Sequence, residues 1–281
     1  GDRPMKKNER AAAIVRTIVV SLIAVLFVVP LVWMVLSSLK TAPEVFARPF
    51  HWLPVKAQWQ NYATVWMNEE ASMLRAFANT LYIALFSIIG QMFISSLAAY
   101  SFAKINFKGK QVVFMLFLSS MMVPSQLTII PRFMLFKTIG LYNNLWAIIL
   151  PAFFGATSIF MLRQFYMGLP NDLIEAAKID GAGHLRIFLR IMLPLTKAAL
   201  MSLIILAFIS SWNEYMAPLI FLVKKELYTV SQNIQWYMLD EFKEHNLTMA
   251  AATSAIVPVV ILFIVGQKYF VEGIATSGVK G

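Results

Sequence analysis

Six long apolar stretches constrain this chain more than any other feature of its sequence. They span residues 14–39, 77–103, 112–130, 145–162, 195–223 and 249–265. A helix needs about 20 mainly apolar residues to cross the hydrocarbon of a bilayer. With 59% hydrophobic and 14% charged residues, the chain also lies outside the composition of soluble globular domains. The sequence therefore predicts an all-α integral membrane protein with six transmembrane helices.

The first stretch follows Lys6, Lys7 and Arg10, as the core of a secretory signal peptide would. Its apolar run is longer than the about 7–15 residues of such a core, so we expect a retained helix. The positive-inside rule then gives the orientation. Placing both termini in the cytoplasm assigns 15 of the 24 Lys and Arg residues to cytoplasmic segments, among them Lys104 and Lys108 in a short loop. It also places Arg132 in an outer loop, residues 131–143.

Several classes of function conflict with the composition. The chain has no cysteine, which excludes disulfides and thiolate metal sites, and its three histidines lie in three different loops. It has no phosphate-binding loop of the ATPase type. The formal net charge of +10 suits basic loops that face anionic lipid, so we expect no nucleic-acid partner. No arrangement of nucleophile, base or metal ligands favours a membrane-embedded enzyme.

The loop between the fourth and fifth stretches, residues 169–194, has the pattern of a helical hairpin. Asp172 and Glu175 have the spacing of a capping box, which predicts the start of a short helix. Gly181 and Gly183 predict a sharp turn after it. A second apolar stripe follows, made of Leu185, Phe188, Leu189 and Met192. From physics alone, this hairpin fits either a docking element or an amphipathic tether at the membrane surface.

The fixed positions of this loop resemble the EAA loop of ABC importer permeases. They are Glu175, Ala176, Ala177, Gly181, Ile191, Leu193 and Pro194. The segments SSLKTAPEVFARPFHWLP and SSWNEYMAPLIF are similar to the carbohydrate branch of that family, which includes six-span permeases such as those of maltose importers. The resemblance implies that the loop is a coupling helix. In that reading, Glu175 contacts an ATPase, Ala176 and Ala177 permit close approach, and Gly181 makes the turn.

The resemblance also implies partners and a location. Residues 1–281 would form a single transmembrane permease domain of a carbohydrate importer in the bacterial inner membrane. A second, unlike permease chain and two P-loop ATPase subunits are expected beside it, with an extracytoplasmic solute-binding protein that delivers the sugar. The chain itself is expected to be non-catalytic and to hold no cofactor, because ATP and magnesium would bind the ATPase subunits. The alternative from another class is a carrier or channel that works without an ATPase.

Two polar clusters are candidates for the substrate path, and each has a structural alternative. One comprises Ser211, Trp212, Asn213, Glu214 and Tyr215, which also fit an interfacial aromatic belt. A continuous helix from Leu195 would place Glu214 about 29 Å along it, near the outer interface. The other comprises Ser125 and Gln126 after Pro124, where the helix is either broken beside a cavity or merely kinked.

Two further features concern polar contacts and partner surfaces. Gln91, Ser95 and Ser96 in the second stretch are expected to form polar contacts with neighbouring helices. Aromatic residues in the predicted outer segments fit either a partner surface or a belt at the lipid interface. They are His51, Trp52, Trp59, Tyr62, Trp66, Trp236 and Tyr237.

Overall fold

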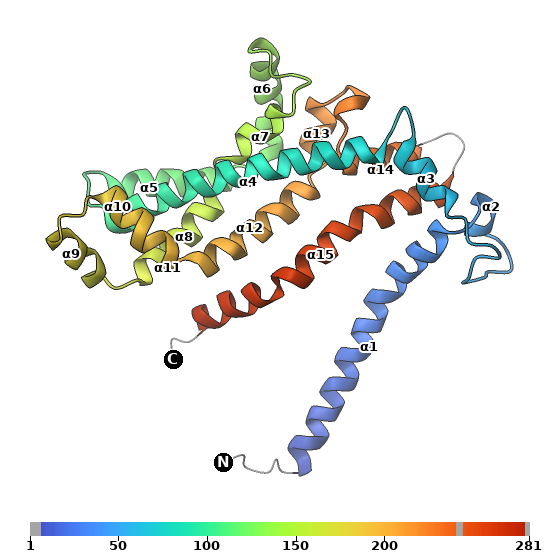
Figure 1. The fold of residues 1–281 in the computed structure, drawn as a ribbon, viewed down its shortest axis with the longest axis horizontal. Coiled ribbons are helices and arrows are strands. Elements are labelled where there is room, and N and C mark those ends of the chain that lie inside the picture. Colours follow the sequence, from blue (N-terminus) through green and yellow to red (C-terminus); the bar gives the residue numbers. More distant parts are fainter. Residues whose placement is uncertain (1–6, 240–243, 279–281) are drawn as a thin grey trace. The chain divides into compact units, whose positions relative to one another are not determined.

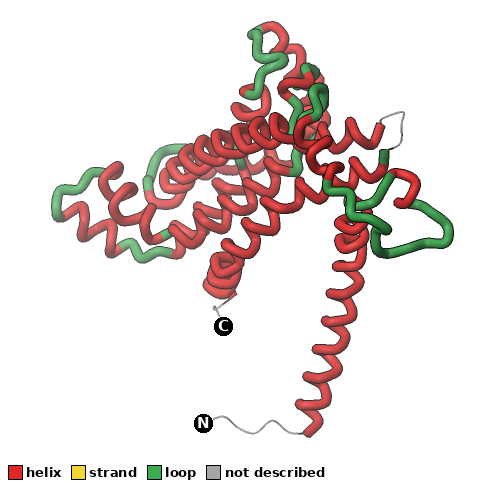
Figure 2. The backbone as a smooth tube through the Cα atoms, turned by 45° about the vertical axis from the view of Figure 1, so that its right-hand side comes forward, coloured by secondary structure: helices red, strands yellow, loops and turns green. Residues whose placement is uncertain are grey.

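The computed structural model describes residues 7–239 and 244–278, and the side chains of residues 13–239 and 244–267. In this part of the chain all regular structure is helical, as Figure 2 shows. The predicted cytoplasmic termini include residues 1–6 and 279–281, which lie outside the described residues. The chain divides into two compact units, residues 1–68 with 234–256, and residues 69–233 with 257–281.

Among the described residues, four helical segments are long and apolar enough to cross a membrane. They are Ala13–Ser38 within α1 (Lys7–Ser38), α4 (Met73–Lys104), Trp146–Gly168 formed by α7 (Trp146–Ala152) and α8 (Ala156–Gly168), and His245–Gln267 within α15 (His245–Gly278). Each overlaps one of the predicted stretches. Length and apolar composition were therefore sufficient to locate these segments to within a few residues.

The other two predicted stretches are bent helix pairs. The third corresponds to α5 (Lys110–Ser119) with the 3-10 turn Ser120–Met122, followed at 96° by α6 (Ser125–Thr138). The fifth corresponds to His184–Leu195 followed at 76° by α12 (Lys197–Trp212), after which the short α13 (Met216–Phe221) begins. The predicted continuous helix over residues 195–223 is therefore wrong. Six spans result if each bent pair crosses the membrane once.

The first unit is held together by buried amide groups. Asn61, in α3 (Gln60–Met67), donates through Nδ2 to the carbonyls of Ser38 at 2.8 Å and Lys40 at 2.9 Å. Asn246, near the start of α15, donates to Asn61 Oδ1 at 3.1 Å. Buried polar groups are costly unless paired, so Asn61 fixes the ends of two long helices to α3.

Several predicted outer aromatic residues serve this packing. Tyr62 Oη lies 2.6 Å from Ser38 Oγ, and Trp66 Nε1 donates to Ser254 Oγ at 3.1 Å. Tyr237 is buried. Trp52 and Trp59 are exposed and remain available for lipid or a partner.

A carboxylate closes the loop after α1. Glu44, in α2 (Ala42–Val45), accepts hydrogen bonds from the backbone N–H groups of Thr41 at 2.9 Å and Val55 at 3.0 Å. These donors favour the ionised carboxylate and hold the pKa of Glu44 below its ordinary value. The loop is therefore fastened across eleven residues by one charged side chain.

In the second unit, α4, α8 and α12 lie side by side, as Figure 1 shows. Glycines permit the close contact of α4 with the chain between α7 and α8. A Cβ atom at Gly90 would lie 2.1 Å from the ring of Phe153, and one at Gly155 would lie 2.1 Å from Gln91 Nε2. Both separations are far inside van der Waals contact. The packing therefore requires glycine at position 90, whereas a Cβ at position 155 would displace the end of the flexible Gln91 side chain.

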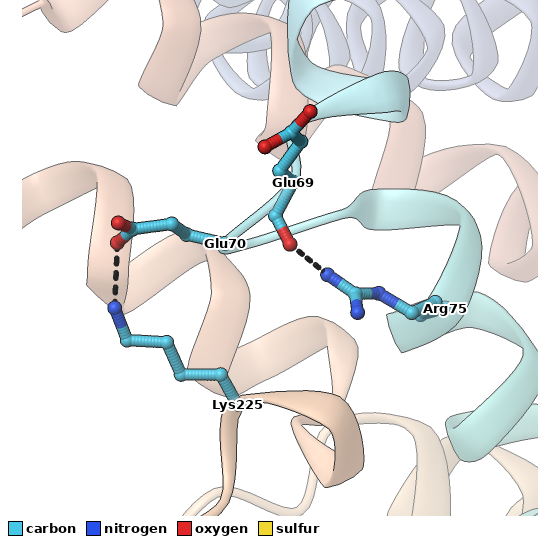
Figure 3. A network of polar contacts seen from close by, with 4 residues as sticks. All are labelled: Glu69, Glu70, Arg75 and Lys225. Carbon is cyan, nitrogen blue, oxygen red and sulfur yellow. Dashed lines mark hydrogen bonds and ion pairs between the residues drawn. The ribbon is translucent and has the colours of Figure 1, made fainter.

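One end of α4 is tied to the segment around residues 222–233. Asn79 donates through Nδ2 to the carbonyls of Glu226 at 2.8 Å and Tyr228 at 3.1 Å. Figure 3 shows the neighbouring surface contacts, in which Lys225 pairs with Glu70 at 2.6 Å and Arg75 donates to the Glu69 carbonyl. The pair is exposed, so we attribute the attachment chiefly to the amide contacts.

Replacing Gly90 by Ala should destabilise the protein because the new methyl group overlaps the Phe153 ring. Overpacking of this kind costs about 1–3 kcal/mol, which thermal unfolding in detergent will register as a lower midpoint. Gly168→Ala is the matched control, since a Cβ there meets nothing within 4 Å. The additional change Phe153→Leu should restore part of the loss. Equal midpoints for Gly90→Ala and the native chain would contradict this packing.

The Glu44 contacts predict a pH-dependent stability. Because the folded-state pKa is lowered, the stabilisation is present above the ordinary glutamate pKa and disappears as the pH falls through the lower folded value. The native chain should therefore melt above Glu44→Gln at pH 7, and the difference should shrink toward pH 3.5. A difference that is constant over this range would exclude the carboxylate as its source.

Candidate functional site

The predicted hairpin forms, but its first helix begins differently from the expectation. Helix α9 (Asp172–Ile179) has Asn171 at its N-cap, with no side-chain cap bond. The predicted capping box of Asp172 and Glu175 is therefore wrong, since Asp172 already lies within the helix. The Asn171 carbonyl instead accepts from the Ile174 and Glu175 N–H groups at 2.8 and 3.0 Å.

Gly181 makes the turn that ends α9. Its φ is +76°, in the left-handed region that glycine adopts without penalty. The Ala182 N–H donates to the Ala177 carbonyl at 2.9 Å, and the Gly181 N–H donates to the Lys178 carbonyl at 3.0 Å, which is the Schellman pattern. Gly183 is extended, with φ −72°, so only the first of the two predicted turn glycines needs its special freedom.

The two faces of α9 differ. Ile174 is buried, and Ala177 packs against the apolar cluster of the second unit. Glu175 and Ala176 are exposed, and Ile179 is 87% exposed. Since residues 172, 175, 176 and 179 share one helical face, Ala177 lies away from the exposed surface that was expected to include it. The sequence reasoning missed Ile179, which continues that face by one turn.

The return arm of the hairpin is helical and partly buried. Helix α10 (His184–Ile187) leads into a π-helical turn (Phe188–Met192) and then α11 (Leu193–Leu195). Ile191 and Leu193 pack against the same cluster as Phe188 and Met192. Pro194, in α11, has no N–H to donate to a preceding carbonyl, and wide helical turns accommodate such a loss. Ile191 and Leu193 therefore shape the packing of the hairpin, whereas Pro194 is exposed.

Polar contacts fasten the hairpin to the last turn of α4. Lys104 Nζ donates to the Leu169 carbonyl at 2.8 Å and to Asn171 Oδ1 at 2.6 Å. On the other arm, Tyr100 Oη lies 3.2 Å from His184 Nδ1, and the Tyr100 ring packs against Phe188. The hairpin lies at this end of α4 in Figure 1. A displacement of α9 would thus be transmitted directly to α4 through these contacts.

A cavity of about 430 Å³ lies elsewhere along α4 in the same unit. Its polar lining comes from three helices, α4, α6 and α12, and from the connection between α12 and α13. The lining polar residues are Ser87, Gln91, Ser125, Gln126, Arg132, Ser210, Ser211 and Glu214. Ser87 and Gln91 fall near the middle of the 32 residues of α4. The cavity therefore lies beside the central part of the longest helix in this unit.

The helix break at Pro124 opens onto this cavity. Pro124 is the N-cap of α6, and the chain turns by 96° there. Ser125 and Gln126 begin the new helix and line the cavity. Of the two readings of this segment, the broken helix is the one observed. Non-helical backbone at membrane depth requires protein or water around it, and the cavity provides that setting.

The second polar cluster separates into two groups. Ser211 and Glu214 line the cavity. Trp212 is buried and stacks on Phe208 with ring centroids 5.4 Å apart, which is a packing role. Asn213 and Tyr215 are not among the lining residues. Asn213 Nδ2 donates to the Ile209 carbonyl at 2.8 Å, which caps α12.

Glu214 does not lie where a continuous helix would place it. Because α12 ends at Trp212, Glu214 sits in the connection to α13 and shares the cavity with residues from the middle of α4. Its Oε1 accepts from the Ala217 N–H at 3.0 Å. Glu214 therefore lies beside the cavity.

Arg132 is the main residue that the sequence analysis missed. We had counted it in an outer loop, but it lies within α6 and lines the cavity, with its guanidinium 5.0 Å from the Phe221 ring centroid. Ser125, Ile129 and Arg132 recur at helical spacing, and this pattern was the available signal. Gln91 has the expected helix contact, donating to Ser158 Oγ at 3.0 Å, and it lines the cavity as well.

Comparisons with known proteins match this chain to membrane components of transport systems. Residues 91–276 match the family described as binding-protein-dependent transport system inner membrane component. The chain is 33% identical over 267 residues to the arabinooligosaccharides transport system permease protein AraQ of Bacillus subtilis (strain 168), covering 94% of this chain and 95% of that one. It is 29% identical over 266 residues to the sn-glycerol-3-phosphate transport system permease protein UgpE of Pectobacterium atrosepticum, covering 92% and 94%.

The fold also has a counterpart among solved structures. A chain from a bacterial ABC transporter involved in the import of the acidic polysaccharide alginate superimposes with a TM-score of 0.84 at 23% identity. The match covers 96% of this chain and 100% of that one. The similarity therefore concerns the arrangement of helices over nearly the whole chain.

The turn at Gly181 can be tested against its neighbour. Gly181→Ala forces a Cβ into the left-handed region at a cost of about 1–2 kcal/mol, so tryptic cleavage in the hairpin, after Lys178 or Arg186, should become about 5–30 times faster. Gly183→Ala should cleave like the native chain, since its backbone is extended and a Cβ meets nothing within 4 Å. Equal cleavage of the two variants would show that the turn does not depend on Gly181.

Proposed function

This chain belongs to the family of binding-protein-dependent transport system inner membrane components, and we propose that it forms half of the translocation path of an ATP-driven carbohydrate importer. The match covers well over half of the chain and includes the hairpin, every cavity-lining residue except Ser87, and most of the last long helix. In this proposal, the chain is a multi-pass, non-catalytic subunit of a bacterial inner membrane. A sugar passes it by alternating access while ATP is hydrolysed in other subunits.

The observation that supports this function most strongly is the exposed face of α9. Glu175, Ala176 and Ile179 share one side of a short helix whose other side packs against the apolar cluster of the second unit. The small Ala176 lets a partner surface approach closely, Ile179 offers an apolar contact, and Glu175 offers a charge for a basic partner residue. We assign this face to the cleft of a P-loop ATPase subunit, whose ATP and magnesium this chain does not bind itself.

The contacts at the end of α4 suggest how the ATPase would act on the path. Movement of α9 would reach α4 through Lys104, which bonds the start of the hairpin, and through Tyr100, which contacts its return arm. The middle of α4 lines the cavity through Ser87 and Gln91. Closure of the two ATPase subunits would thus reorient the cavity walls, as alternating access requires.

Further partners follow from the same proposal. Half of a path needs a second half, which we assign to an unlike permease chain, and two ATPase subunits would dock one on each permease. The family description includes dependence on a binding protein, so an extracytoplasmic solute-binding protein would deliver the sugar. We place both termini and the hairpin in the cytoplasm, supported by the distribution of Lys and Arg.

The names of the relatives support a carbohydrate or related polyol as the cargo. One transports arabinooligosaccharides and another transports sn-glycerol 3-phosphate, judging by their names. A carrier or channel independent of ATP remains the alternative. No feature of the described residues favours it over the ATPase-driven importer.

Reversing the charge of Glu175 tests the proposal. When the tagged chain is purified from its native membrane in mild detergent, a P-loop ATPase and a second permease should accompany it. Glu175→Lys should lower the amount of ATPase about 30-fold or more, because loss of one partner of a buried charged pair costs about 2–5 kcal/mol. The second permease should remain bound.

The control is Glu226→Lys, the same charge change in an exposed turn outside the hairpin. It should retain both partners at native levels. Recovery of the native chain without any ATPase, together with solute uptake by proteoliposomes that lack ATP, would replace the importer by a carrier.

A further inference from the structure

Two buried polar atoms beside the cavity have no hydrogen-bond partner among the described residues. They are Ser87 Oγ, on a residue that is 3% exposed, and Arg132 Nε. Buried polar atoms are nearly always paired in folded proteins. Both atoms belong to residues that line the cavity.

The two charged residues of the cavity have opposite signs and are not paired with each other. The ion pair found in the described part of the chain joins Glu70 and Lys225, not Arg132 and Glu214. Arg132 can only donate hydrogen bonds, and ionised Glu214 can only accept them. Ala217 N–H occupies one carboxylate oxygen of Glu214, which leaves the other for a ligand.

We propose that this cavity binds the sugar directly and selects uncharged oligosaccharides over acidic ones, with Arg132 and Glu214 as the residues that determine specificity. A sugar hydroxyl both donates and accepts, so neighbouring hydroxyls can satisfy Arg132 and Glu214 at once. An anionic group that pairs with Arg132 would bring its charge close to Glu214, and this repulsion disfavours it. The proposal refines the proposed function by naming its substrate class.

The rest of the lining suits a short piece of sugar. Phe154, which is 66% exposed, lines the cavity with Met216 and Ile129, and such apolar groups can cover the C–H face of a sugar ring. Small-molecule sites have volumes of about 300–1,000 Å³. At about 430 Å³, the cavity is large enough for a short segment of an oligosaccharide and too small for a whole polymer. A longer sugar would therefore pass through it one segment at a time.

The absence of cysteine from the chain allows a direct binding test. Ala207 lines the cavity, and Ala207→Cys in the full complex, in membrane vesicles, gives a single reactive thiol on this subunit. The probes are arabinotriose, maltotriose and cellotriose as neutral sugars and a guluronate trisaccharide as the acidic sugar. The rate of alkylation by iodoacetamide is measured with each probe.

At least one neutral probe should slow alkylation about 10-fold at saturation, and the acidic probe should not slow it. Adding Glu214→Gln, whose amide oxygen can still accept from Ala217, should allow the acidic probe to protect. Adding Arg132→Gln should lower the affinity for the neutral probe about 10-fold, since a hydrogen bond to a charged group is lost. Protection should then need an about 10-fold higher concentration of that probe. Lys137→Gln is the matched control on α6, because it removes a charge outside the cavity lining.

The proposal is overturned if no neutral probe protects, if the acidic probe protects the native lining equally, or if Glu214→Gln leaves the selectivity unchanged. These outcomes do not depend on ATP. Protection without an associated ATPase would support the sugar-binding cavity and contradict the ATP-driven importer. An ATPase-bound complex without protection would support the importer and contradict the sugar-binding cavity.

Discussion

The requirement that every backbone N–H and C=O find a partner within the membrane governs the rest of this structure. Continuous helices meet it by themselves, as α4 does. The third and fifth predicted stretches do not. Two of their helix breaks, at Pro124 and after Trp212, lie beside the same cavity, whereas the 76° bend before Lys197 follows the hairpin. Local side chains take up part of the loss, since Glu214 receives the Ala217 N–H. Helix breakage and a polar cavity are therefore two aspects of one arrangement.

A second arrangement links that cavity to the hairpin. The Schellman turn at Gly181 and the buried Ile174 hold α9 in one orientation, and Lys104 and Tyr100 fasten both arms to α4. The middle of α4 is kept close to its neighbours by Gly90 and Gly155. A rigid rod with a docking element at one end and cavity walls along its length is well suited to transmit movement, since packed interiors deform little.

Sequence patterns located the long apolar helices well, because hydrocarbon imposes a length and composition on them that few other structures share. They failed where backbone geometry depends on neighbours. Residues 195–223 read as one helix, yet the chain leaves the helix at Trp212. Arg132 read as a loop residue because a charge near the end of an apolar stretch usually marks its boundary. Ala177 matched the family motif at the expected position, but the sequence alone did not distinguish an exposed alanine from one packed on the core.

The presence of one cation and one anion in the cavity has an energetic consequence for the cell. A membrane potential of 100 mV does about 2.3 kcal/mol of work on each elementary charge that crosses. An uncharged sugar moving past Arg132 and Glu214 transfers no net charge, so the potential neither drives its uptake nor opposes it. Small ions gain no excess attraction from walls whose formal charges cancel. Accumulation against a gradient must then draw on a chemical source of energy, and the voltage across the membrane is conserved while the sugar enters.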